Sequence, residues 1–313
     1  MARDELITHR IPEVADCDDA TIHRDVLSRV EPVVLRGLVG HWAATRHGRT
    51  SPQAIIGYLR QLDNGSLVNA ILIPPEAGGR LGYNATLSGF NFARNRVSLA
   101  SVGEQILRYS AFARAPAVAA QAARIDECLP GFVDENPLTL LDRSVRPRLW
   151  LGNAITTPAH VDETHNIACV VSGRRRFTLF PPEQIANLYV GPVDFTPTGA
   201  PIVLPSLTEP DFEHFPRLRV ALENARVAEL EPGDALYIPA LWWHQVESLS
   251  NCNVLVNYWW HPIAGEAVGA SPVFGPEAPV SDHIPPERRG LLGEITPEMA
   301  QHIRAQLLGR LKR

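Results

Sequence analysis

Several features that would assign this sequence to a particular class are scarce or missing. The four cysteines, Cys17, Cys128, Cys169 and Cys252, are widely scattered, and no two form a C-x-x-C pair. We therefore expect neither a disulfide framework nor a cysteine zinc site. Lysine is nearly absent, since Lys312 is the only one, whereas arginine is plentiful. We attribute this bias to base composition and not to function.

Long apolar runs are missing as well. No uninterrupted apolar stretch approaches the roughly 18 residues of a membrane span, and the N-terminal MARDELITHRIPEV offers no apolar segment suited to a signal peptide. A net charge of −5 gives no general attraction to nucleic-acid phosphates. A basic run such as Arg174-Arg175-Arg176 is more typical of a solvated face. We expect a soluble cytoplasmic protein without membrane or nucleic-acid partners.

The second half of the chain is built from short strands. With 313 residues, of which 45% are hydrophobic, the chain is long enough for one large domain, alone or with an appendage. From Arg148 onward, Pro and Gly divide segments such as RPRLWLGNA, NIACVVSGRRRFTLFPP, GAPIVLP, RVAELEPGDALYIPA and NVLVNYWWHP. Short strands without long helices between them favour an antiparallel sandwich or barrel. In VSGRRRFTLFPP, the glycine predicts a hairpin turn, and the double proline ends the strand.

The first half mixes strands and helices. EPVVLRGLVGHWAA predicts a short strand that leads towards a helix, and SPQAIIGYLRQL predicts an amphipathic helix with a serine cap. SLVNAILIPP and GRLGYNATLSGFNF have strand-like patterns. Val97 to Leu129 has a helical pattern, which we expect to buttress a sheet. At the other end, TPEMAQHIRAQLLGRLKR predicts a terminal amphipathic helix that packs either on its own core or on a second subunit.

The stretch TTPAHVDETHN places His160 and Asp162 two residues apart, just after a proline. Alternate side chains of a strand share a face, so both can point into one cavity with their Cα atoms about 7 Å apart. Two ligands alone do not hold iron tightly. EPGDALYIPALWWHQVESL offers His244 as a third ligand. Two histidines and one carboxylate leave three positions open on non-haem Fe(II), so we predict that these residues form an iron centre that is also the catalytic centre.

Each of these residues also has an ordinary structural interpretation. An H-x-D pair arises by chance in many proteins, and a histidine after two tryptophans is commonly a packed neighbour. The combination is more specific, because H-x-D, a G-D-x-L-Y-I-P turn and His244 follow one another within an all-β stretch. It favours the metal site. The tryptophans of this stretch either wall the site or belong to the core: Trp242, Trp243, Trp259 and Trp260.

The segments TPAHVDE, GRRRFTLFPPEQ, EPGDALYIPALWWHQVESL and VNYWW occur in this order, and PVVLRGLV lies near the N-terminus. Together they resemble the cupin-like JmjC family of Fe(II)- and 2-oxoglutarate-dependent oxygenases, and most of all the branch with the asparaginyl hydroxylase of hypoxia-inducible factor. The resemblance implies a mainly β fold with flanking helices. A double-stranded β-helix (jelly-roll or cupin) core would span residues 148–264, with an N-terminal buttress of strands and helices over 1–147 and a C-terminal loop and helix over 265–313.

The resemblance also implies a site for 2-oxoglutarate as cosubstrate. Thr157 takes the position whose hydroxyl reaches the far carboxylate, and Tyr83 in GRLGYNATL is a candidate for a second hydroxyl there. Asn166 and Asn257 match two amides that line the pocket. A dicarboxylate inside a barrel needs a cation and several neutral donors, because its desolvation is costly. For Asn257, a strand-end amide bonded to the backbone is the alternative.

The sequence departs from the family where that cation is expected. The usual lysine is replaced by Arg175, within Arg174-Arg175-Arg176. Arginine binds a carboxylate bidentately and more rigidly than lysine, but it is longer and planar. The pocket is then reshaped, or a different small acid is used. A neighbouring arginine is an alternative partner, since a one-residue slip turns a strand side chain to the other face.

The activity that the resemblance implies is hydroxylation of a protein or peptide side chain, with release of succinate and CO2. An extended substrate would cross the barrel mouth near Tyr83 and residues 190–215. The alternatives are a hydroxylase of RNA or of a small metabolite, and a metal-binding cupin without turnover. The C-terminal helix resembles the dimerising helices of the same branch, so we expect a homodimer formed through it.

Overall fold

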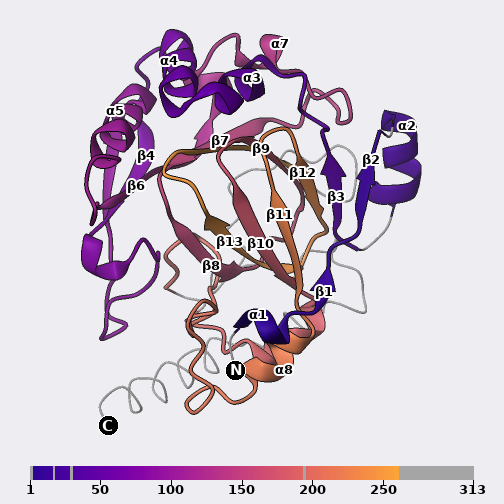
Figure 1. Ribbon diagram of the computed structural model, residues 1–313, viewed down its shortest axis with the longest axis vertical. Helices are drawn as coiled ribbons and strands as arrows, with labels where there is room; N and C mark the ends of the chain where they lie inside the picture. Colours follow the sequence, from indigo (N-terminus) through magenta and orange to yellow (C-terminus); the bar gives the residue numbers. More distant parts are fainter. Residues whose placement is uncertain (1–2, 17, 29–30, 193–194, 261–313) are drawn as a thin grey trace.

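Two β-sheets packed face to face form the centre of the molecule (Figure 1). The computed structural model describes residues 3–16, 18–28, 31–192 and 195–260. The smaller sheet has five strands in the order β1 (His9–Arg10), β11 (Arg226–Leu230), β10 (Arg175–Phe180), β13 (Trp243–Ser248) and β8 (Thr156–His160).

The larger sheet has nine strands. Its central strands face the smaller sheet, and strands from the first half of the chain extend it on both sides. In order, they are β2 (Glu13–Ala15), β3 (Val33–Arg36), β12 (Ala235–Ile238), β9 (His165–Ser172), β14 (Asn253–Trp260), β7 (Pro147–Gly152), β6 (Ala117–Arg124), β4 (Val68–Ile73) and β5 (Ala93–Val97).

The space between the sheets is filled by apolar side chains from both of them. Phe177 and Leu179 of β10 meet Ala168 of β9, Leu236 of β12 and Leu255 of β14 in one buried cluster. Alternate residues of each strand supply this interior, as the two-residue period of a strand requires. Together with the cupin-like family match reported below, this arrangement confirms the predicted jelly-roll core with flanking helices.

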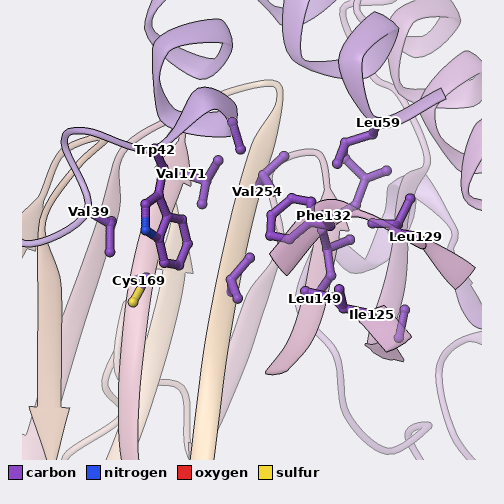
Figure 2. Packing of buried hydrophobic residues seen from close by; sticks show 14 of the residues in the cluster. Val39, Trp42, Leu59, Ile125, Leu129, Phe132, Leu149, Cys169, Val171 and Val254 are labelled. Carbon is purple, nitrogen blue, oxygen red and sulfur yellow. The ribbon is translucent and has the colours of Figure 1, made fainter. Parts of the chain in front are cut away.

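Helices cover the outer face of the larger sheet. α3 (Ala43–Thr50), α4 (Pro52–Leu62) and α5 (Leu99–Tyr109) pack there, and Trp42, Phe132, Leu149, Val171 and Val254 fill the layer beneath them (Figure 2). α4 begins as predicted, because the Ser51 hydroxyl accepts from the Ala54 amide and Pro52 occupies the first turn.

The outer face of the smaller sheet is covered by two short helices, α1 (Arg3–Leu6) and α8 (Leu218–Glu223) (Figure 1). Leu6 and Leu222 pack there against Phe180 and Trp243. The remaining short helical segments lie in connections: α2 (Asp19–Ile22), the π-helical η1 (His23–Leu27), the 3-10 helices η2 (Pro75–Ala77) and η3 (Pro182–Asn187), α6 (Ile125–Cys128) and α7 (Phe132–Glu135).

The prediction of helix over Val97 to Leu129 is wrong in its middle. α5 ends at Tyr109, and the alanine-rich Ala117–Arg124 is strand β6, paired with both β4 and β7. A Cβ on Gly152 of β7 would lie 2.9 Å from the Ala119 Cβ, so this part of the sheet has room only for small side chains. Pairing with distant strands therefore overrides the helix propensity of alanine.

Two further expectations are corrected by the sheet topology. β9 and β10 are not a hairpin, because β9 pairs with β12 and β14 whereas β10 pairs with β11 and β13. Gly173, with φ 73°, turns the chain from one sheet to the other. The predicted strands in GRLGYNATLSGFNF and GAPIVLP are loops held by isolated bridges, such as the one between Tyr83 and Phe90.

The C-terminal residues 265–313, with the predicted dimerisation helix, lie outside the described residues. Among the helices that the structure describes, none combines the length and apolar character needed to cross a membrane.

Candidate active site

Three side chains meet where β8 ends beside β13. His160, the last residue of β8, is paired directly with His244 of β13, and Asp162 follows two residues later. Their ligand atoms lie within 4.8 Å of one another. The two imidazole rings are 4.2 Å apart between centroids, and His244 Nε2 is 3.6 Å from Asp162 Oδ2. The three side chains thus converge as predicted and form a group that could hold a metal ion.

Backbone carbonyls orient both histidines. Nδ1 of His160 lies 2.9 Å from the Pro158 carbonyl, and Nδ1 of His244 lies 3.0 Å from the Trp242 carbonyl. A carbonyl only accepts, so each Nδ1 carries the proton and each Nε2 presents its lone pair. Fixing the ring through its second nitrogen is the usual way in which a protein prepares a histidine for a metal.

The protonation state of His244 suits the same role. This side chain is 3% exposed, and burial, together with the neighbouring His160, lowers its pKa to about 4. The imidazole is therefore neutral at pH 7 without a metal, and no proton has to leave it when a cation binds.

Thr157 lies on the same face as His160, although the two are three positions apart, an odd spacing that would normally place them on opposite faces. The register shifts here, since His244 is paired with His160 but Val246 is paired with Thr157. Residues directly opposite each other share a face, and His244 and Val246 are two apart on one strand. The bulge therefore turns Thr157 towards the interior, where Val246 packs against the cluster between the sheets.

Arg175 is the arginine of the basic run that enters the interior. It alternates with Phe177 and Leu179, whose side chains belong to the interior cluster. Arg174 and Arg176 lie elsewhere, in ion pairs with Glu229 at 2.6 Å and with Asp4 at 2.7 Å. Of the alternatives that the sequence left open, Arg175 is therefore the one that the register directs towards the site.

The Arg175 guanidinium is a buried cation without a carboxylate partner among the described residues. The residue is 8% exposed, its Nε has no hydrogen-bond partner within the part of the chain that the structure describes, and burial lowers its pKa to about 10. It stands opposite Ser248, four residues along β13 from His244, which corresponds to about 13 Å of strand. An unpaired cation in such a position is expensive, unless an anionic ligand completes it.

Asn166 and Asn257 face the interior from the larger sheet and bind each other. Asn257 Nδ2 donates to Asn166 Oδ1 at 3.2 Å, and its own Oδ1 accepts from the Trp150 indole at 2.8 Å. Asn257 is 1% exposed. The Asn257 side chain is therefore part of an interior network. These two contacts are with other side chains, and not with the backbone as in the alternative interpretation.

Tyr83 lies in a loop beside the site, and its hydroxyl is turned towards another loop. The hydroxyl donates to the Phe195 carbonyl at 2.6 Å, and the ring packs against Phe90 and Phe195. This places Tyr83 in the wall of an adjoining cleft.

That cleft has a volume of about 470 Å³. It adjoins β8, because Ile202 in its wall forms an isolated bridge with His160. The Arg80 guanidinium ties two walls together by donating to the Leu204 and Pro205 carbonyls, each at 2.9 Å. The surface of the cleft is largely apolar, and it includes the carboxylates of Glu209 and Asp211. The residues that line the cleft are Arg80, Leu81, Gly82, Tyr83, Asn84, Ala85, Leu87, Asn91, Ile202, Leu204, Pro205, Ser206, Glu209, Asp211, His214 and Phe215.

The roles of three residues at the site were not predicted from the sequence. Trp259 donates its indole N–H to Asp162 Oδ2 at 3.2 Å, whereas the sequence suggested only a wall or core role for it. Trp150 supports the amide network, and nothing in its segment marks it. Burial raises the pKa of Glu163, next to Asp162, to about 7.

A comparison with known protein families agrees with this geometry. A family model described as a cupin-like domain matches residues 19–266, which is most of the chain. The chain belongs to the cupin-like family. The match extends well into the N-terminal half, in keeping with the strands that this half adds to the larger sheet.

Individual relatives point to the JmjC group of this family. The chain is 33% identical over 138 residues to lysine-specific demethylase JMJ31 of Arabidopsis thaliana, which is 44% of this chain and 24% of that protein. It is 35% identical over 113 residues to human HSPB1-associated protein 1, or 36% of this chain and 22% of that protein. Jumonji C domain-containing protein 5 of Drosophila melanogaster is 33% identical over 164 residues, or 50% of this chain and 36% of that protein.

The aligned segments thus cover between 22% and 36% of the length of these three relatives. JmjC proteins are typically Fe(II)- and 2-oxoglutarate-dependent oxygenases, and the family resemblance drawn from the sequence is confirmed at this level. The narrower likeness to the asparaginyl hydroxylase stays a prediction.

Proposed function

We propose that this protein is an Fe(II)- and 2-oxoglutarate-dependent dioxygenase that hydroxylates a side chain of a protein or peptide. The observation that carries the proposal is one interior face that holds both halves of the required site. The three candidate ligands, His160, Asp162 and His244, lie at one end of it. Arg175, which has no carboxylate partner among residues 3–260 as far as the structure describes them, lies further along.

The donor set suits the metal. Two neutral imidazoles and one carboxylate are the ligands that non-haem iron takes when three positions stay open for other molecules. His160 and His244 would hold the ion through Nε2, because each Nδ1 is bound to a carbonyl. Asp162 supplies the negative charge that two neutral ligands lack.

The other end of the face suits a dicarboxylate. Arg175 presents a planar fork that binds a carboxylate bidentately, and Thr157 adds a hydroxyl on the same face. Asn166 and Asn257 offer amides from the opposite sheet. When bound, iron and 2-oxoglutarate would together activate O2, so that one of its oxygen atoms enters a C–H bond of the substrate and the other enters the succinate that forms as 2-oxoglutarate loses CO2.

The chain's own part is to hold these groups and to keep water away from them. Phe177, Leu179 and Leu255 line the interior beside the site and exclude bulk solvent. A dry interior strengthens the attraction between Arg175 and a carboxylate, since charges interact more strongly where water is absent.

The cleft beside β8 supports a peptide as substrate. It is open, largely apolar and adjacent to His160 through Ile202, so an extended chain lying in it would pass close to the metal ligands. RNA has less support, because the cleft carries exposed carboxylates at Glu209 and Asp211, which repel phosphates. A hydroxylase of a small metabolite is the remaining alternative. We further propose that the protein acts in the cytoplasm.

Demethylation of an N-methyl group is a second candidate, because it begins with the same hydroxylation. It is favoured by the name of the Arabidopsis relative, a lysine-specific demethylase. The product distinguishes the two reactions, since hydroxylation of a side chain adds one oxygen atom whereas demethylation removes a methyl group.

The test exposes a library of peptides, with and without N-methylated lysine, to the protein with Fe(II), 2-oxoglutarate and ascorbate, and reads products by mass spectrometry. We expect peptides that gain one oxygen atom, and a loss of this product in His160→Ala. Leu204→Arg, which places a bulky cation in the cleft wall, should lower peptide hydroxylation and leave 2-oxoglutarate binding intact. Oxidation of a nucleoside or small metabolite, with no change in any peptide, would contradict the peptide proposal.

A further inference from the structure

The carboxylate of Asp162 is held differently from the two histidines. His160 and His244 belong to paired strands, and each ring is bound to a carbonyl of its own segment. Asp162 lies beyond the end of β8, so no ladder fixes its side chain. Among the described residues, the hydrogen bond to its carboxylate comes from Trp259, whose Nε1 donates to Oδ2 at 3.2 Å.

Trp259 is itself held in place by contacts on the inner face of the larger sheet. Its ring meets the Trp150 ring edge-on, with centroids 6.1 Å apart and planes at 85°. Trp150 is anchored in turn, because its indole donates to Asn257 Oδ1 at 2.8 Å, and Asn257 donates to Asn166. The indole N–H therefore reaches Asp162 from a ring that has little freedom to turn away.

This chain of contacts joins the two halves of the proposed site. It begins at the carboxylate of Asp162, passes through two tryptophan rings and ends at the amide pair on β14 and β9. Such support should raise the metal affinity of a ligand on a loop, because a carboxylate that is already oriented loses less conformational entropy when the ion binds.

We infer that Trp259 is a positioning residue for the metal centre, which orients the Asp162 carboxylate through its indole N–H. The inference rests on the proposed function, since it takes the three residues as metal ligands. It adds Trp259, which is not itself a ligand, to the residues that determine the metal affinity. The loss of such an outer hydrogen bond typically costs about 10- to 100-fold in metal affinity.

Trp259→Phe is the direct test, because the aromatic ring and its contact with Trp150 are kept while the N–H donor is lost. Trp260→Phe is the matched control. It is the next residue of the same strand, and its ring packs on Tyr237 and His165 at the outer face. The measurement is Co(II) binding to the metal-free protein. Titration gives the affinity, the visible absorption of the bound ion reports its coordination, and no turnover is needed.

We expect Trp259→Phe to bind Co(II) about 10- to 100-fold more weakly and with an altered absorption band, whereas Trp260→Phe binds like the wild type. Melting curves of the metal-free proteins report whether each variant is folded. If the phenylalanine variant does not fold, Trp259→Met replaces it, since its long apolar side chain fills part of the same space and carries no N–H or O–H donor.

The outcomes separate this inference from the proposed function. If His160→Ala abolishes Co(II) binding but Trp259→Phe binds as tightly as the wild type with the same absorption band, the positioning role is wrong and the metal site stands. If His160→Ala binds Co(II) like the wild type, the metal site itself is misassigned. An equal loss of affinity in Trp259→Phe and Trp260→Phe would also overturn the inference, because the effect would then not depend on the N–H.

Discussion

Arg175 and Arg176 are neighbours in β10, yet their side chains lie on opposite sides of the smaller sheet. Arg176 meets Asp4 at 2.7 Å on the outer face, whereas Arg175 points between the sheets and has no carboxylate partner among the described residues. Arg176 is thus engaged in an ion pair on the outer face, whereas Arg175 is the cation to which the proposed function assigns the carboxylate of 2-oxoglutarate.

Arg175→Met should abolish 2-oxoglutarate binding and stabilise the metal-free, ligand-free protein. Removing a buried cation that lacks a partner removes its desolvation cost, so the free energy of unfolding should rise by about 1–3 kcal/mol. In the wild type, 2-oxoglutarate at about 100 times its Kd should add about 2.7 kcal/mol, and in the variant nothing.

Urea unfolding with and without the ligand measures both effects, and Arg176→Met is the control. The control should keep the ligand-induced stabilisation, because its guanidinium pairs with Asp4 on the outer face. A variant at position 175 that still gains stability from 2-oxoglutarate would show that the anion binds elsewhere.

Thr157→Val should weaken 2-oxoglutarate binding by about 3- to 10-fold, as expected for one lost hydrogen bond worth about 1 kcal/mol. The substitution keeps the shape of the side chain and removes the hydroxyl. Thr156→Val is the matched control, since Thr156 is paired with Glu247 and so shares its outer face. Calorimetry with a redox-inert metal in place of iron gives both Kd values, and equal effects at the two positions would contradict the facing that the bulge assigns.

Acid should destabilise the metal-free protein through His244. Its pKa is about 4 when folded, against 6.5 when unfolded, because burial and the nearby His160 disfavour the charged ring. Between these values the unfolded chain binds more protons, so the free energy of unfolding falls as the pH falls from about 6.5 to 4. The loss should approach about 3 kcal/mol.

The His244→Gln variant isolates this contribution, since glutamine does not titrate. Between about pH 6.5 and 4, the unfolding free energy of the metal-free wild type should fall by about 3 kcal/mol more than that of the variant. Parallel curves would show that His244 is not the source of the acid sensitivity.

The packing of α3 on β9 should be intolerant of a single methyl group. A Cβ on Gly48 would collide with the Val171 carbonyl, so Gly48→Ala should lower the free energy of unfolding by about 1–3 kcal/mol. Gly57→Ala in α4 is the control, because nothing lies within 4 Å of its added Cβ. This control should gain about 0.5–1 kcal/mol from helix propensity. Thermal unfolding compares the two, and a stable Gly48→Ala would mean that the helix is not seated against β9.

The sequence was sufficient to predict the parts of the fold that depend on local patterns. Ser51 and Pro52 mark the start of α4, and the Pro and Gly residues that divide the second half of the chain indicate its short strands. The convergence of His160, Asp162 and His244 was also predictable, because H-x-D and the later histidine form a specific combination.

The parts that the sequence did not reveal depend on distant partners. Ala117–Arg124 is a strand only because β4 and β7 flank it, and the turn at Gly173 changes sheets because β10 has its partners in the smaller one. A pattern read along the chain cannot show such pairings. The same limit hid the role of Trp259, since its contact with Asp162 joins residues far apart in sequence.

The central claim is that this interior face binds iron and 2-oxoglutarate and performs oxidative chemistry. The most direct measurement supplies purified protein with Fe(II), ascorbate and 2-oxoglutarate labelled at its first carboxylate, and records labelled CO2 without any added substrate. We predict slow turnover that is lost in His160→Ala and Arg175→Met and kept in Arg176→Met. No labelled CO2 from a protein that binds metal tightly but does not bind 2-oxoglutarate would contradict the account.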